Sequence, residues 1–322
     1  MNLLITGANG FIGKALVARL LSRGLPWAGA EESPPHATLM DLAFDGPEEP
    51  HTTRLTGSLL DKNLQARAFA NPVDVVFHLA SIPGGMAEQQ YELARQVNLD
   101  ATVALLEAAR AQTLASSKQP VFVFASSIAA LGSPLPDPVD DSTPSRPTLT
   151  YGAHKWIGEI LVGDFSRRAW VNGRSVRLPG IVARPPQRTG QLSAFLSDII
   201  RDLAEGRFFA CPVAADSTTW LMSVQCIVDN LIHAATLPSE QCAQRRIWTL
   251  PALRSTMAEL VDAIAAVYGG EAANRVTYRS NPALEANFGR YPPLYTPAAD
   301  AAGFRHDGDL QTLVRRALEP IA

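Results

Sequence analysis

The sequence predicts an α/β fold, a doubly wound parallel sheet with a smaller α/β substrate lobe formed by the C-terminal half. Short apolar runs of strand length alternate with helical patterns over the first 180 residues. A glycine-rich turn joins the first run to the first helix, and small or polar residues end several of the later runs. We therefore expect a dinucleotide-binding domain at residues 1–180 and a substrate-binding lobe at residues 181–322.

Composition limits the class of protein. With 322 residues, 47% of them hydrophobic, the chain can form one large domain and a smaller lobe. A net charge of -3 without basic runs argues against a nucleic-acid or membrane partner. The three cysteines have no metal-like spacing, so we expect no metal site and a reducing compartment. Because the apolar N-terminus is short and no run reaches membrane-spanning length, we expect a cytoplasmic protein.

The first element is a buried strand at residues 3–6, followed by three glycines and a helix that ends near Gly24. Such a loop lets backbone approach a pyrophosphate, whose charge then lies at a helix N-terminus. The spacing is Gly-x-x-Gly-x-x-Gly rather than the commoner Gly-x-Gly-x-x-Gly. The residues expected to contact the dinucleotide here are Gly7, Asn9, Gly10, Phe11, Ile12 and Gly13.

The second strand, at residues 37–41, ends in Asp41. An acid at this position accepts hydrogen bonds from the ribose hydroxyls of NAD and repels the extra phosphate of NADP. Asp41 lies further from the glycines than the usual distance of roughly 20 residues, and Asp45 is the alternative. A third strand is expected at residues 54–59, with Ser58 and Leu59 at its end near the adenine.

A central strand is expected at residues 73–80, where a β-rich apolar run suits a strand that is covered on both faces. His78 is interpreted as a packed core histidine, and Leu79, Ala80 and Ser81 as residues that let a cofactor come close. Residues 82–88 are expected to form a mobile loop. A helix over residues 91–111 carries Asn98, which either bonds backbone near the site or is an exposed helix residue.

A fifth strand at residues 121–125 ends in Ser126 and Ser127, and a helix beginning near Tyr151 follows. Tyr151 and Lys155 are four residues apart and so share one face of that helix. A cation beside a tyrosine favours the phenolate, which is a usable base. By itself this pair is weak evidence, because such pairs occur by chance on many helices.

A sixth strand at residues 174–178 ends at Pro179, with Ile181 close behind as a further cofactor contact. Beyond it, helices are expected at residues 193–203, 224–235 and 256–267, and short strands at residues 208–210 and 246–249. This half should form the substrate lobe and lend one strand to the main sheet.

The glycine loop, Ser127 and the Tyr151-x-x-x-Lys155 pair together resemble the extended, epimerase/dehydratase-type branch of the short-chain dehydrogenase/reductase superfamily. The resemblance implies a Rossmann fold, NAD as cofactor and Tyr151 as the general acid/base. It also implies that Lys155 holds the nicotinamide ribose and lowers the pKa of Tyr151, and that Ser127 positions the reacting oxygen while Ser126 lies on the cofactor side. A homodimer formed through the helices at residues 91–111 and 151–165 is expected from the same resemblance.

Departures from the superfamily narrow the expected chemistry. Ile128, Ala129 and Ala130 stand where sugar-nucleotide dehydratases carry proton-transferring acids, so dehydration is disfavoured. Gly180 stands where epimerases carry the asparagine that helps bind a diphosphate. A small anionic substrate suits the sequence better, with Arg184 or Arg188 holding its carboxylate.

Several segments are similar, more specifically, to the family of D-erythronate dehydrogenases. This resemblance implies NAD-dependent oxidation of the C2 hydroxyl of a four-carbon sugar acid. Substrate contacts are expected from Ser81, Ser127, Tyr151, Arg184, Ser193 and Trp220; Trp220, Phe195 and Met86 are each more often simply core. The segments are residues 85–88, 97–100, 151–155, 177–179 with 184–185, 211–213, 220–223 and 230–234.

With Tyr151 as the base, its pKa must fall by about three units from 10 for work at neutral pH, roughly 4 kcal/mol of phenolate stabilisation. One alternative function is a nucleotide-sugar 4-epimerase or ketoreductase. The other, from a different class, is a non-catalytic NAD-sensing protein, against which the presence of Ser127, Tyr151 and Lys155 argues.

Overall fold

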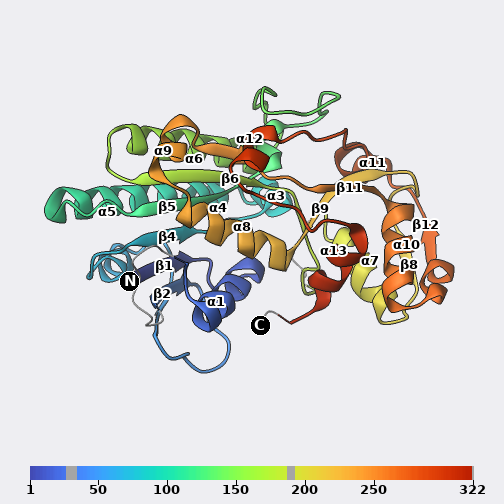
Figure 1. The fold of residues 1–322 in the computed structure, drawn as a ribbon, viewed down its shortest axis with the longest axis horizontal. Helices are drawn as coiled ribbons and strands as arrows, with labels where there is room; N and C mark the ends of the chain where they lie inside the picture. Colours follow the sequence, from blue (N-terminus) through green and yellow to red (C-terminus); the bar gives the residue numbers. More distant parts are fainter. Residues whose placement is uncertain (27–34, 187–192, 321–322) are drawn as a thin grey trace.

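A computed structural model describes residues 1–26, 35–186 and 193–320. Its centre is a seven-stranded sheet in the order β10-β6-β5-β4-β1-β2-β3, in which every neighbouring pair is parallel (Figure 1). This confirms the predicted fold class. The strands are β1 (Asn2–Thr6), β2 (His36–Asp41), β3 (Thr52–Thr56), β4 (Val75–His78), β5 (Val121–Ser127), β6 (Asn172–Leu178) and β10 (Ile247–Thr249).

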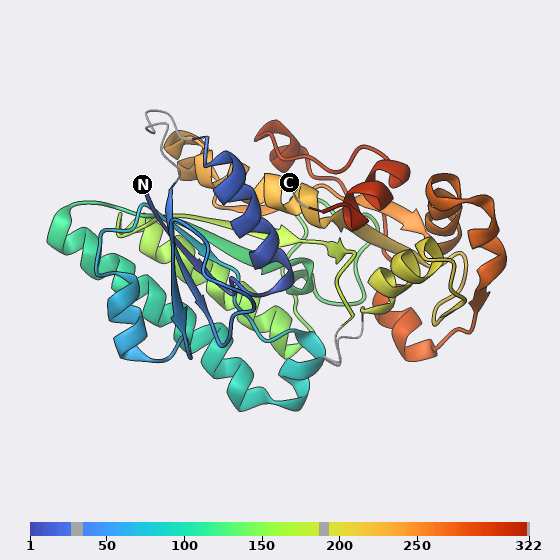
Figure 2. The ribbon, with the colours of Figure 1, turned by 90° about the horizontal axis from the view of Figure 1, so that it is seen from below.

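Helices cover both faces of this sheet (Figure 2). On one face α1 (Phe11–Arg23) and α8 (Val224–Thr236) pack over Leu3 and Ile5 of β1. On the other, α2 (Lys62–Ala68), α5 (Ala101–Ser116) and α6 (Thr150–Arg167) pack with Leu4. Successive side chains of a strand point to opposite faces, so one apolar run serves both cores.

Several elements end elsewhere than predicted. The third strand stops at Thr56 and is followed by Gly57, whose φ is +146°. The expected loop at residues 82–88 contains a short helix, α3 (Gly84–Gln89). The long helix is interrupted between α4 (Tyr91–Arg95) and α5 by a π-helical turn, η1 (Gln96–Asp100). That turn holds Asn98.

The C-terminal half forms a second core. Its three-stranded sheet has the order β11 (Leu253–Thr256), β9 (Thr218–Ser223), β7 (Gly180–Val182), and a two-stranded sheet pairs β8 (Phe209–Cys211) with β12 (Val276–Tyr278). The prediction that the C-terminal half contributes one strand to the main sheet is confirmed, because β10 pairs with β6. The remaining elements are η2 (Ile128–Leu131), α7 (Phe195–Ala204), α9 (Ser239–Gln244), α10 (Met257–Tyr268), η3 (Gly270–Arg275), α11 (Pro282–Phe288), α12 (Pro297–Ala301) and α13 (Leu310–Leu318).

The two halves share the main core, since residues of α8, β10 and α12 pack with β1, β4 and β5. The division at residue 180 therefore stays a prediction. Within the described ranges, no helix is long and apolar enough to cross a membrane, and no three His, Cys, Asp or Glu residues are grouped as a metal site would need. The cysteines are Cys211, Cys226 and Cys242, all free and buried.

Candidate active site

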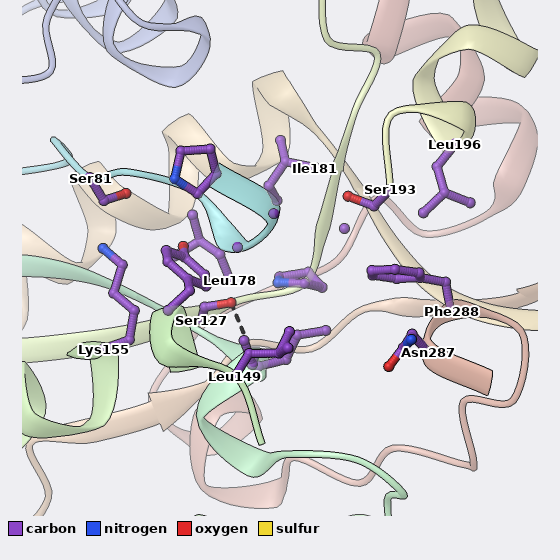
Figure 3. Close-up of a pocket in the computed structure, with 18 of the residues that line it drawn as sticks. Ser81, Ser127, Leu149, Lys155, Leu178, Ile181, Ser193, Leu196, Asn287 and Phe288 are labelled. Carbon is purple, nitrogen blue, oxygen red and sulfur yellow. Dashed lines mark hydrogen bonds between the residues drawn. The ribbon is translucent and has the colours of Figure 1, made fainter. Parts of the chain in front are cut away.

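A cavity of about 670 Å³ opens at the carboxyl edge of the parallel strands. It extends from the glycine loop, past Ser127 and Tyr151, to residues 286–288 and 290–291 of the C-terminal half. Figure 3 shows Ser81 and Lys155 on one side, Ser127 between, and Asn287 and Phe288 across the cavity. Ligands of doubly wound sheets bind at this edge.

The glycine loop has no room for side chains at two of its three glycines. Gly7 has a φ of +70°, and a Cβ atom there would lie 2.8 Å from the Ala80 nitrogen. A Cβ atom on Gly13 would lie 2.1 Å from the Gly7 oxygen. The backbone is therefore packed tightly where α1 begins, and the first residues of that helix line the cavity, which fits the diphosphate of a dinucleotide.

Asp41 lies beside the loop, at the end of β2. Its Oδ2 accepts a hydrogen bond from the Asn9 nitrogen at 2.8 Å, and its Oδ1 accepts one from the Leu42 nitrogen at 2.7 Å. Asp45, the alternative acid, instead forms an exposed ion pair with Lys14. The structure thus places the Asp41 carboxylate next to the loop, as a ribose-binding acid requires.

Some of the predicted cofactor residues lie outside the lining of the cavity. The Asn98 side chain is buried and bonds both backbone groups of Ile82, which answers the question left open by the sequence. Ser58 accepts a bond from the Leu60 nitrogen, and Leu59 is buried in the core. The residues that do not line the cavity are Asn9, Asp41, Ser58, Leu59, Ala80 and Asn98.

Lys155 lies in the cavity wall and is only 3% exposed. Its Nζ donates to the Ala125 oxygen at 2.6 Å and lies 5.6 Å from the centroid of the Tyr151 ring. Burial lowers the pKa of Lys155 to about 7, while the Glu159 carboxylate, one turn further along α6, raises it.

Tyr151 differs from expectation in its acidity. Burial raises the pKa of Tyr151 above 10.0, while hydrogen bonds with the Ser127 and Ser81 hydroxyls and the charge of Arg184 lower it. The Lys155 ammonium, 5.6 Å from the centroid of the Tyr151 ring, is directed at the Ala125 carbonyl. The charge of Arg184, from the C-terminal half, is one of the causes that lower the pKa of Tyr151.

The two serines at the end of β5 have different partners. Ser127 caps η2 by accepting a bond from the Ala129 nitrogen at 3.1 Å, and it faces Tyr151. Ser126 is buried and donates to Glu159 at 2.5 Å. Both line the cavity.

Of the predicted substrate residues, Ser81, Ser127, Tyr151, Arg184 and Ser193 line the cavity. The Arg184 guanidinium lies 5.8 Å from the centroid of the Phe11 ring, and burial lowers the pKa of Arg184. Arg188, the other candidate for the carboxylate, lies outside the described residues. The cofactor candidates in the lining are Gly7, Gly10, Phe11, Ile12, Gly13, Leu79, Ser81, Ser126, Tyr151, Lys155, Pro179 and Ile181.

Trp220 is not brought to the cavity. It is fully buried, its indole nitrogen donates to the Pro292 oxygen at 2.8 Å, and its ring packs against Tyr291, which does line the cavity. Trp220 thus supports the wall from behind. Met86 lines the cavity, whereas Phe195 lies both in the lobe core and at the start of α7.

The far wall of the cavity, which the sequence did not predict, is made by Asn287, Phe288, Arg290 and Tyr291. No motif marks this segment, which follows the short helix α11 late in the chain. Only the packing of the C-terminal half against the sheet edge brings it opposite Tyr151.

Fold and cavity together define a Rossmann-type enzyme of the NAD-dependent oxidoreductases, with a serine, a tyrosine and a lysine beside a dinucleotide loop. Residues 3–224 match the NAD dependent epimerase/dehydratase family, and the chain belongs to that family.

Two relatives align with nearly the whole chain. The D-erythronate dehydrogenase of Cupriavidus necator is 37% identical, with 99% of this chain and 98% of that protein covered. The D-erythronate dehydrogenase of Haemophilus influenzae is 29% identical, with 99% of each covered. Among solved structures, a nucleoside-diphosphate-sugar epimerase from Agrobacterium tumefaciens superposes with a TM-score of 0.89 at 30% identity, covering 98% of this chain and 92% of that one.

Proposed function

We propose that the protein oxidises the C2 hydroxyl of a small sugar acid with NAD, converting D-erythronate to 2-dehydro-D-erythronate. The observation that supports this most is the cavity that holds Arg184 together with Tyr151. A 2-hydroxy acid carries its carboxylate on the carbon next to the reacting one, so the base and a carboxylate-binding cation must lie close together. The D-erythronate dehydrogenases that resemble this chain along its whole length support the same substrate.

In the proposed mechanism Tyr151 takes the proton of the C2 hydroxyl. The Ser127 and Ser81 hydroxyls, which already bond the Tyr151 side chain, hold the substrate oxygen, and Arg184 binds the carboxylate. Lys155 and the glycine loop hold NAD, which when bound supplies the hydride acceptor and a positive ring.

Electrostatics decide whether Tyr151 can act as this base. Burial opposes the phenolate, so nearby hydroxyl donors and positive charge must offset it. Ser127, Ser81 and Arg184 do so within the protein. A substrate carboxylate bound to Arg184 reduces that help, which makes the charge of Lys155 and of the oxidised cofactor more important in the ternary complex.

A second candidate is a nucleotide-sugar 4-epimerase or ketoreductase. The superposition on the Agrobacterium tumefaciens epimerase favours it. Gly180, which lines the cavity in place of a diphosphate-binding side chain, argues against it. A non-catalytic NAD sensor ranks lower, because Ser127, Tyr151 and Lys155 line one cavity.

The test follows nicotinamide reduction with NAD and with NADP against D-erythronate, other sugar acids and UDP-sugars. We expect turnover with D-erythronate and a preference for NAD. Activity confined to UDP-sugars contradicts the sugar-acid proposal, and a preference for NADP contradicts the role of Asp41. Cofactor binding without turnover of any substrate supports the sensor instead.

We also propose a homodimer through α4, α5 and α6. These helices carry exposed apolar side chains. Exposing a group of apolar side chains to water is unfavourable, and such groups often mark protein–protein interfaces. The α5 and α6 helices pack side by side. The exposed residues are Tyr91, Leu93, Val103, Leu114, Trp156, Ile157 and Ile160.

A further inference from the structure

We infer that Asn287 recognises the hydroxyl tail of the substrate and that Glu285 positions it for this role. The inference rests on the proposed function and adds a specificity determinant on the side of the cavity opposite the dinucleotide loop. It assigns the substrate class to polyhydroxylated acids rather than to simple 2-hydroxy acids.

Asn287 lies on the side of the cavity opposite Lys155 (Figure 3). Asn287 and Phe288 form the C-terminal end of α11 and line the same cavity as Tyr151 and Arg184. Figure 3 shows both across the cavity from Lys155, with Ser127 between the two sides. A substrate whose C2 lies at Tyr151 and whose carboxylate lies at Arg184 has its remaining carbons free to extend toward Asn287.

The amide of Asn287 is already oriented. Its Nδ2 donates to the Ala283 oxygen at 2.8 Å, one turn back in α11. Among the described residues no other hydrogen bond uses this side chain, so its Oδ1 and second N–H are available to a ligand hydroxyl. Beside it, the Phe288 ring offers an apolar surface to the carbon chain.

Both apolar and polar contacts hold α11 in place: Leu284 and Phe288 pack, partly buried, against the core of the C-terminal half. Glu285 accepts bonds from the Ala214 nitrogen at 3.1 Å, from the Ser280 hydroxyl at 2.7 Å and from the Ser217 hydroxyl. The residues on either side are also tied: the Asn281 nitrogen donates to the Pro212 oxygen, and the Thr218 nitrogen donates to the Gly289 oxygen. Glu285 is thus a central anchor that fixes where Asn287 points.

The bond to a substrate hydroxyl is absent for the analogue that lacks this hydroxyl. Because Asn287 is exposed in the free protein, water pairs its amide in that case, so the bond contributes the net energy of an ordinary neutral hydrogen bond. The matched pair of substrates is D-erythronate and (R)-2-hydroxybutyrate. Both have four carbons and a C2 hydroxyl, and only D-erythronate has hydroxyls on C3 and C4. The ratio of their kcat/KM values therefore measures recognition of the tail.

The experiment measures kcat/KM for both acids in the wild type, Asn287→Ala and Asn287→Leu, with the KM for NAD as a second readout. We expect Asn287→Ala to lower kcat/KM for D-erythronate about 3- to 10-fold and to change that for (R)-2-hydroxybutyrate less than about twofold. The KM for NAD should stay unchanged. The control is Asn274→Ala, whose side chain bonds Glu271 in η3, outside the cavity lining.

Glu285→Gln tests the anchor. We expect a higher KM for D-erythronate with an unchanged KM for NAD, since only the far wall moves. The inference is overturned if the ratio of the kcat/KM values for the two acids is the same in Asn287→Ala as in the wild type, whether both values fall equally or neither changes. That outcome leaves the proposed function in place. Failure of the wild type to oxidise any sugar acid overturns the proposed function and the inference with it.

Discussion

Arg177 of β6 binds both carboxylate oxygens of Glu159 of α6. Its Nε lies 2.8 Å from Oε1 and its terminal Nη2 lies 2.7 Å from Oε2, and the Glu159 side chain has no exposed surface. The same carboxylate accepts the Ser126 hydroxyl, and Arg177 also donates to Ser145. The pair thus joins β5, β6 and α6 directly behind the cavity, one helical turn from Lys155.

Removing one charge of this pair should destabilise the fold strongly. Glu159→Gln leaves the buried Arg177 guanidinium without its counter-ion, and we expect a loss of about 3–5 kcal/mol in the free energy of unfolding. Denaturant titration measures it. The matched control is Glu107→Gln, which breaks the exposed pair with Arg110 and should change stability by less than about 1 kcal/mol. Equal effects of the two substitutions would contradict the interpretation.

Tyr151→Phe removes the hydroxyl and keeps the ring that packs near Lys155. We expect turnover of D-erythronate to fall at least about 10³-fold, because the general base and its hydrogen bonds to Ser127 and Ser81 are both lost. A positioned general base contributes roughly this factor to the rate. The affinity for NAD, measured by calorimetry, should change little. Substantial residual activity would mean that another group takes the proton.

Motifs that are local in sequence were predictable, and contacts made by distant segments were not. The glycine loop and the Tyr151–Lys155 pair each lie within a few residues of chain, so helix and loop geometry fixes them. Asn287 reaches the cavity only because the C-terminal half folds back onto the sheet edge. Trp220 was predicted to contact the substrate but is packed behind the cavity wall. The sequence does not distinguish an aromatic residue that lines the cavity from one that packs behind the lining.

The acidity of Tyr151 shows another limit of sequence reasoning. Helical spacing places Lys155 near Tyr151, yet the direction of its Nζ depends on the Ala125 carbonyl at the end of β5. Arg184 acts on Tyr151 from a strand-following segment of the other half, and no spacing rule relates the two. Element ends also depend on backbone conformation, as at Gly57, which follows the last residue of β3 and has a φ of +146°.

Arg184→Met tests the cation that acts on Tyr151. Because the charge of Arg184 lowers the pKa of Tyr151, its removal should raise that pKa and move the rising limb of the pH–rate profile for oxidation to higher pH. The KM for D-erythronate should rise about 10- to 100-fold from the lost charge-assisted bonds to the carboxylate. Arg184→Lys keeps the positive charge. It should therefore return the rising limb of the pH–rate profile closer to its wild-type position than it returns the KM for D-erythronate to its wild-type value. An unmoved limb in Arg184→Met would exclude this role.

Ile160→Glu tests the proposed homodimer. Ile160 is 54% exposed on α6, and a charge buried there against a partner copy would be costly. We expect light scattering after gel filtration to give a dimer for the wild type and a monomer for Ile160→Glu. Phe208→Glu, an exposed residue of the C-terminal half at 79%, should remain dimeric. A monomeric wild type would contradict the proposal.

His78 should make the fold sensitive to acid. Its ring lies between the Thr6 and Thr102 hydroxyls, at 2.7 and 2.8 Å, and near the rings of Phe122 and Phe124. Burial, with a smaller contribution from the charge of Lys155, lowers the pKa of His78 from 6.5 to about 3. The folded protein therefore keeps this ring neutral over a range of pH in which the unfolded chain binds a proton.

The sign of the effect follows from that difference. Between pH 6.5 and 3 the unfolded state holds one more proton at this site, so the free energy of unfolding falls as the pH falls, with a limiting slope of about 1.4 kcal/mol per pH unit. His78→Asn keeps a polar side chain that cannot titrate, so its stability should fall less steeply over the same window. Urea titrations of both proteins at several pH values between 6.5 and 4 give the two slopes, and their difference isolates His78 because the carboxylates contribute equally to both. Parallel slopes would show that the ring is protonated in the folded state.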